Sequence, residues 1–216
     1  GPEISVASTK AYMVQLAVFY LLAFRLSYVR GAITEEQCMS YTEKLLGIPE
    51  LIEKILEKPE TCQFAASRLV ADEHLLYIGR GLDYALSMEG SLKLKEISYI
   101  HSESYAAGEL KHGTISLITE DMPVIAVATQ RDVLDKTVSN IKEVKSRGAF
   151  TIVVTREGTD FDKDVADILV TVPETDDLLM PMTAVVPLQL IAYYTADLRG
   201  NDVDKPRNLA KSVTVE

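Results

Sequence analysis

The chain has few of the residues that form metal sites and disulfide frameworks. Its 216 residues include no tryptophan, two cysteines and three histidines. Cys38 and Cys62 lie in stretches of helical pattern without a CxxC partner, and the histidines are not spaced as metal ligands. We therefore expect no metal, no other cofactor, and free thiols in a cytoplasmic protein.

Positive charge is also scarce. Lys and Arg total 22 against 32 Asp and Glu, which gives a net charge of −10 and an isoelectric point near 4.9. No run of basic residues interleaved with aromatic ones occurs, so we do not expect a nucleic-acid partner. An acidic surface is still compatible with a local anion site.

One long hydrophobic stretch is present, at residues 11–29 (AYMVQLAVFYLLAFRLSYV). Its length admits a transmembrane helix. Gln15, Arg25 and the lack of a positively charged flank favour a helix that packs against protein instead. No basic segment followed by an apolar segment and a cleavage site precedes it. We expect no membrane association, and a partner surface for this helix.

Apolar runs of strand length alternate with helical patterns from about residue 60 onward. The strand-like runs are 74–79, 123–129, 150–155 and 167–173. The helical patterns are 83–100, 131–147 and 178–199. Continuously apolar strands that alternate with helices predict a parallel sheet covered on both faces. The expected fold class is therefore α/β, a three-layer αβα sandwich preceded by helices.

The pattern divides the chain into three parts. Three helical stretches precede the sheet, at about 8–30, 34–46 and 48–58. No periodicity follows Gly200. The expected organisation is a helical segment over 1–58, the α/β domain over 59–200 and a tail over 201–216.

In open α/β sheets, ligands bind beyond the carboxyl ends of the strands. Three expected loops qualify: 79–83 (GRGLD), 129–132 (TQRD) and 155–160 (TREGTD). The first could bring backbone amides to an anion at a helix N-terminus, but it is not GxGxxG and a tight turn also explains it. The hydroxyl and basic residues of the other two suit either a phosphate or plain helix caps and turns.

The helix expected over 83–100 carries charge on two faces. At about 100° per residue, Glu89, Lys93 and Glu96 cluster among apolar side chains, while Lys95 lies on the opposite arc. A sheltered carboxylate and ammonium one turn apart are typical of a proton-transfer pair. The same spacing also gives ordinary ion pairs on an exposed helix.

His112 is a further candidate. It follows Lys111 and precedes Gly113 near a possible helix end. An imidazole titrates in the range that general acid–base catalysis needs. A histidine at a helix C-terminus can equally be a cap that offsets the helix dipole.

Four strings resemble one family, the glucosamine-6-phosphate synthases (glutamine:fructose-6-phosphate aminotransferases). They are GPEISVASTK (1–10), EGSLKLKEISYIH (89–101), AAGELKHG (106–113) and PRNLAKSVTVE (206–216). They occur in the family's order along the whole chain. The resemblance implies an enzyme that makes glucosamine 6-phosphate and glutamate from fructose 6-phosphate and glutamine, in amino-sugar biosynthesis.

The resemblance also implies an architecture. The family joins a glutaminase domain to an isomerase domain made of two sugar isomerase (SIS) halves. This chain resembles the end of the first half and the whole second half. We therefore expect it to lack the glutaminase, the first SIS half and the Ser/Thr-rich phosphate loop, and to be inactive alone. A sugar phosphate and a second copy of the chain, as a homodimer, are the expected partners.

The resemblance assigns three catalytic roles here. Lys211 resembles the lysine that opens the ketose and forms a Schiff base at its C2. Glu96 resembles the base that moves a proton between C1 and C2. Lys93 would handle the proton at the adjacent oxygen.

Three further positions match the family's site, and Glu89 is a candidate beside them. His112 resembles a ring-opening histidine supplied by the neighbouring subunit. Val6 and Ala210 match backbone positions beside the sugar. Glu89 is expected to orient the charged groups around it, and the tail would act as an active-site lid.

Two other functions remain open from the sequence. One is a stand-alone SIS module that binds a phosphosugar and regulates another process; this module would need its own Ser/Thr-rich phosphate loop. The other is a different sugar-phosphate isomerase or deglycase of the superfamily. The ending KSVTVE favours the synthase family over the second.

Overall fold

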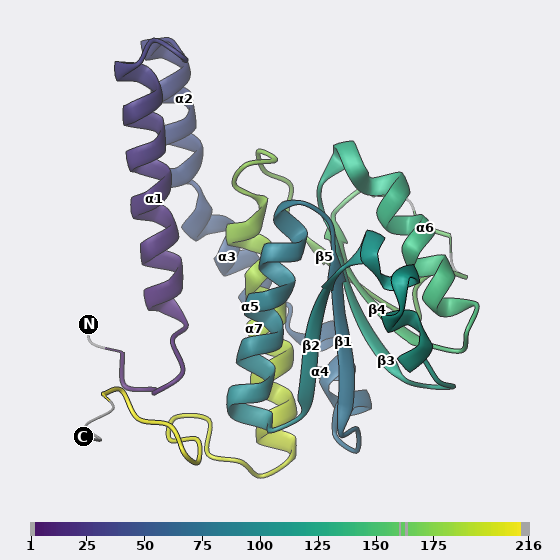
Figure 1. Ribbon diagram of the computed structural model, residues 1–216. Coiled ribbons are helices and arrows are strands. Elements are labelled where there is room, and N and C mark those ends of the chain that lie inside the picture. The colour runs from purple at the N-terminus through teal and green to yellow at the C-terminus, as the bar shows by residue number, and fades with distance from the viewer. Residues whose placement is uncertain (1–2, 160, 163, 213–216) are drawn as a thin grey trace.

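The computed structural model describes residues 3–159, 161–162 and 164–212. Its centre is a five-stranded, wholly parallel sheet in the order β2-β1-β3-β4-β5 (Figure 1). The strands are β1 (His74–Gly79), β2 (His101–Ala106), β3 (Pro123–Ala128), β4 (Phe150–Arg156) and β5 (Ile168–Val172). The predicted α/β fold is confirmed.

Helices cover both faces of this sheet. The α-helices are α1 (Lys10–Val29), α2 (Glu35–Leu46), α3 (Ile48–Leu56), α4 (Glu60–Leu69), α5 (Leu82–Ser98), α6 (Leu134–Lys145) and α7 (Met180–Leu198). Three short 3₁₀ helices are η1 (Ala107–His112), η2 (Thr114–Leu117) and η3 (Arg131–Val133). The packing of α4, α5 and α7 buries one apolar core, and that of α6, η1 and η2 buries another on the opposite face. The expected three layers are present.

One strand and one α-helix were not predicted from the sequence pattern. Strand β2 has the polar sequence HSESYA, yet it pairs with β1 over its whole length. An edge strand pairs with a neighbour on one side only, so its sequence can be more polar than that of a central strand. Helix α4 was not predicted either, although four of its ten residues are buried.

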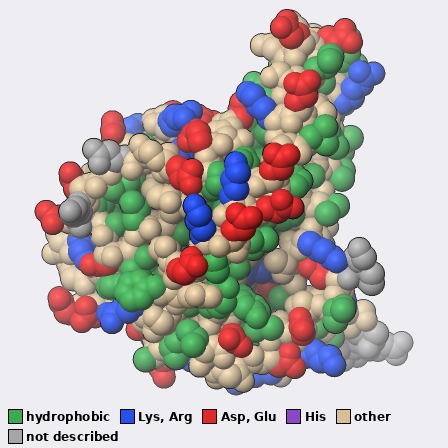
Figure 2. Space-filling view, turned by 180° about the vertical axis from the view of Figure 1, so that it is seen from behind, with side chains coloured by type: hydrophobic (Ala, Val, Ile, Leu, Met, Phe, Trp, Pro, Cys, Tyr) green, Lys and Arg blue, Asp and Glu red, His purple; other side chains and the backbone are tan. Residues whose placement is uncertain are grey.

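Helices α1 and α2 form a hairpin that projects from the domain (Figure 1). A capping box between Thr34 and Gln37 starts α2. Phe24 is the one fully buried residue of α1, and apolar side chains such as Phe19 and Leu22 are exposed. Figure 2 shows hydrophobic side chains among acidic ones along the hairpin. By length and composition alone α1 could cross a bilayer, a test that core helices of soluble proteins also pass.

The tail runs beside the N-terminal segment. The Val6 backbone N–H donates to the Asp204 carbonyl at 2.9 Å. The Arg207 N–H donates to the Tyr99 hydroxyl at 2.8 Å, and the Arg207 guanidinium lies over the Tyr99 ring. The tail is therefore attached to the end of α5 as well as to residues near the start of the chain.

Candidate functional site

The charged cluster on α5 is sheltered, as the sequence predicts. The Lys93 ammonium lies 2.5 Å from Glu96 Oε2 and 3.7 Å from Glu89 Oε1. The side chain of Lys93 is 6% exposed, that of Glu89 12% and that of Glu96 22%. An ammonium in that setting is held by its carboxylates rather than by water. The alternative of an exposed ion pair is therefore wrong for this helix.

The opposite arc of α5 faces the sheet. Ser87 Oγ donates to the Ile78 carbonyl at 3.1 Å, and Ser91 Oγ donates to the Ser102 carbonyl at 3.0 Å. These bonds fix the rotation of α5 about its axis. The Glu89–Lys93–Glu96 face is consequently turned away from the sheet, toward the start of α1.

Burial sets the electrostatics of this face. It raises the pKa of Glu89, an effect that the Lys93 charge opposes and the Glu96 charge reinforces. Burial, with the Glu89 charge as a second cause, also raises the pKa of Tyr12 on α1 to about 12. Glu89 thus holds a proton more readily than an ordinary exposed carboxylate does.

A cleft of about 530 Å³ opens beside Lys93. Its walls come from the N-terminal segment, α1, α3, α5, α7 and the tail, and they are mostly apolar. Lys10, Gln189 and Asp204 are among its polar residues. Lys93 is the one predicted site residue among the residues that line it. Gln189 and Asp204 carried no signal in the sequence, since only the fold brings α7 and the tail to this place.

Lys211 and Ala210 are exposed on the tail, and Val6 is half-buried in the segment beside it. The charge of Lys211 acts on the Glu3 carboxylate, which accepts hydrogen bonds from the Thr9 and Lys10 amides. Lys211 thus lies near the N-terminal segment, which also contains Val6. Among the described residues, no hydrogen bond or ion pair links Lys211 to the charged cluster of α5.

His112 lies elsewhere. It is exposed at the end of η1, which packs against α6 on the face of the sheet opposite to α5. Within one chain, His112 and Lys93 therefore do not lie in the same site. Within the described residues, no group of three or more His, Cys, Asp or Glu side chains is arranged to hold a metal ion.

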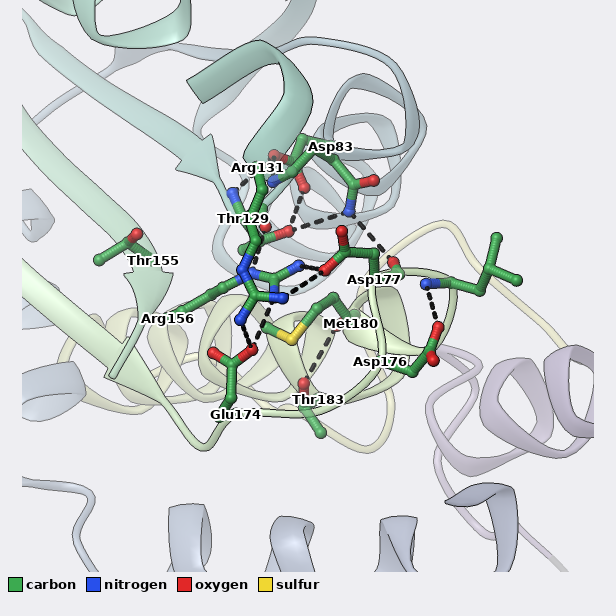
Figure 3. Close-up of polar contacts among 12 residues, drawn as sticks. Asp83, Thr129, Arg131, Thr155, Arg156, Glu174, Asp176, Asp177, Met180 and Thr183 are labelled. Atoms are coloured by element: carbon green, nitrogen blue, oxygen red, sulfur yellow. Dashed lines mark hydrogen bonds and ion pairs between the residues drawn. The ribbon is translucent and has the colours of Figure 1, made fainter. Parts of the chain in front are cut away.

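A second polar network closes the carboxyl edge of the sheet (Figure 3). Asp83, in the first turn of α5, accepts hydrogen bonds from the Thr129 N–H at 2.7 Å and the Gln130 N–H at 3.1 Å. Burial raises the Asp83 pKa, although these bonds oppose the shift. Gly81 precedes α5 with φ +57°, a conformation that favours glycine. The loop after β1 therefore serves as a tight turn that seats Asp83.

The basic residues of the other two loops already have anionic partners. The buried Arg156 guanidinium binds Glu174 at 2.7 Å and also binds Asp177 (Figure 3). Arg131, more exposed, pairs with the same two carboxylates. The acidic loop that carries Glu174 and Asp177 thus occupies the edge of the sheet where a phosphate could have bound.

Comparison with known proteins identifies the fold family. Residues 68–198 match the model of the SIS domain. The chain belongs to the SIS domain family. Over its full length this SIS chain is 52% identical to glutamine–fructose-6-phosphate aminotransferase [isomerizing] of Clostridium tetani and 50% identical to that of Clostridium acetobutylicum. The resemblance seen in the sequence is confirmed.

A solved structure agrees with this assignment. The C-terminal domain of glucosamine-fructose-6-phosphate aminotransferase from Francisella tularensis is 37% identical, with a TM-score of 0.89. The match covers 95% of the SIS chain and 58% of that domain. The SIS chain spans 36% of the length of the two clostridial relatives.

Proposed function

We propose that this chain is the C-terminal isomerase portion of an aminotransferase that converts fructose 6-phosphate and glutamine to glucosamine 6-phosphate and glutamate. The sheltered Glu89–Lys93–Glu96 cluster, beside a cleft walled by the N-terminal segment and the tail, is the observation that carries the proposal. The similarity to the clostridial aminotransferases supports it.

In this proposal the Lys211 amine attacks C2 of the open ketose and expels water, which gives a Schiff base. Ammonia then displaces the lysine from C2. Glu96 removes the proton from C1 and returns it to C2, while Lys93 moves the proton of the adjacent oxygen. The product is the 2-amino aldose.

The other predicted residues orient these groups. The backbone at Val6 and Ala210 would lie beside the sugar, and Glu89 would orient Lys93. His112 would open the ring in a neighbouring copy, which its position away from the cluster of its own chain supports. A homodimer, a cytoplasmic location and the division at residues 58 and 200 are parts of the same proposal.

A chimera tests this function. The 216 residues replace the matching stretch of the Clostridium acetobutylicum enzyme, whose remaining residues supply what the family's other domains provide. We expect glucosamine 6-phosphate from fructose 6-phosphate and glutamine, and none from the 216-residue chain alone. A folded chimera without product would contradict the proposal. Phosphosugar binding without turnover would favour the regulatory SIS module instead.

A further inference from the structure

Two buried side-chain atoms, one on α5 and one on α7, make no hydrogen bond to any described residue. Among the described residues, Glu89 Oε1 and Gln189 Nε2 are buried without a hydrogen bond. The first is an acceptor and the second a donor. A buried polar atom without a partner costs free energy, and a native protein usually retains one for a reason.

Both side chains lie toward the start of α1. Helices α5 and α7 are in close contact where Gly90 meets Leu188, because a Cβ on Gly90 would lie 2.9 Å from Leu188 Cδ1. Glu89 and Gln189 are the adjacent residues. Met13 of α1 lines the cleft together with Gln189.

Lys93 belongs both to the charged cluster with Glu89 and to the lining of the cleft with Gln189. Its ammonium is 3.7 Å from Glu89 Oε1, and its side chain lines the same cleft as Gln189. An ammonium has three N–H donors, and Glu96 takes one of them at 2.5 Å. A carboxamide offers an acceptor and a donor at once.

We propose that Gln189 is a positioning residue whose amide oxygen accepts from Lys93 and whose amide nitrogen donates to Glu89. This rests on the proposed function. Rotation of the Gln189 side chain makes both bonds when substrate enters the cleft. The Lys93 ammonium is then held between Gln189 and Glu96 while a proton moves. The effect falls on the chemical step rather than on sugar binding.

Substitutions in the chimera test this role. Gln189→Leu removes both bonds, so kcat should fall about tenfold to a hundredfold, as for hydrogen bonds to charged groups. KM should stay nearly unchanged. The thermal midpoint should stay equal or rise, because an apolar group of similar size replaces an unpaired donor. Gln63→Leu, at an exposed glutamine of α4, is the matched control.

A double variant separates positioning from structure. Glu89→Gln with Gln189→Leu should be no slower than the slower single variant, since both changes break one connected set of bonds. The proposal would be overturned if the losses of kcat in the two single variants multiplied in the double variant. An unchanged kcat for Gln189→Leu would also overturn it, as would a loss of kcat that runs parallel to a loss of thermal midpoint.

If the Gln189→Leu variant does not fold, a second substitution at the same position still tests the proposal. Gln189→Glu keeps the size and the acceptor but places a like charge near Glu89. The carboxylates facing this site are Glu89 and Glu96 of α5 and Asp204 of the tail, with Lys93, Lys10 and Tyr12 opposite. The acid limb of the kcat profile should shift to higher pH, and an unshifted limb would contradict the role. An active Glu96→Gln chimera would instead contradict the proposed function itself.

Discussion

At the scale of single residues, the contacts of Lys93 define the site. Its ammonium is nearly enclosed, with Glu96 in direct contact and Glu89 slightly farther away. Its charge opposes the effect of burial, which raises the pKa of Glu89. The helical spacing predicted this cluster, because residues three and four apart share a face. Gln189 was not predicted, since nothing in its own stretch indicates that it reaches α5.

Glu96→Gln in the chimera should abolish proton transfer between C1 and C2. The amide keeps the shape of the carboxylate but cannot accept the proton. We expect a loss of kcat of about 10²–10⁴-fold, measured by exchange of the C1 proton with solvent deuterium. Glu36→Gln, an exposed substitution on α2, should have no effect. Near-normal exchange in the Glu96 variant would mean that the cluster is only a scaffold.

Glu89 should give stability a specific pH dependence. Burial raises its folded-state pKa above the ordinary value of 4.5, so the folded chain binds the proton more tightly than the unfolded chain. The stability of the wild type relative to Glu89→Gln should therefore fall as the pH rises from 4.5 through that raised pKa. Urea unfolding across this range measures the difference. A constant or rising difference would contradict the assignment.

At the scale of elements, continuous apolar runs were enough to predict β1, β3, β4 and β5. Strand β2 could not be predicted, because it lies at the edge and its polar sequence is stabilised by pairing with β1. The loops could not be interpreted either. A basic residue after a strand can bind either a phosphate or a carboxylate of the same chain. Arg156 binds carboxylates of the acidic loop before α7, which is distant in the sequence.

The isosteric change Asp83→Asn should loosen the junction between α5 and β3. The carboxylate accepts two backbone N–H groups on one oxygen and the Thr129 hydroxyl on the other. The Asn oxygen can keep the two N–H bonds, but its NH2 group then donates to the Thr129 hydroxyl, which loses its own acceptor. We expect a loss of about 1–3 kcal/mol in the free energy of unfolding, the cost of an unsatisfied buried donor. Asp135→Asn, exposed on α6, is the control and should change little. Equal stabilities would show that this contact contributes nothing.

At the scale of the whole molecule, the hairpin of α1 and α2 projects from the α/β domain. Packing within the domain does not explain why this hairpin is present. Lys44 binds Asp176 at 2.7 Å, and the Tyr20 hydroxyl donates to the Leu178 carbonyl, so the loop before α7 fastens the hairpin to the domain. Most of α1 remains exposed. Exposed apolar faces of this extent usually mark a contact surface.

The 216-residue chain should therefore self-associate. Light scattering at micromolar concentration should give a mass near twice the 23.9 kDa of one chain. Leu22→Glu, on the exposed face of α1, should shift the population toward monomer. Leu117→Glu, at an exposed leucine of η2, should not. A concentration-independent monomer for the wild type would remove the support for a site shared between copies.

The central claim is that this chain carries the lysine that binds the sugar covalently. Borohydride reduces a Schiff base to a stable amine, so the chimera incubated with fructose 6-phosphate and borohydride should retain the sugar on one lysine. Peptide mass spectrometry should find the adduct on Lys211, and Lys211→Ala should abolish it. An adduct on another lysine, or labelling that survives Lys211→Ala, would contradict the account.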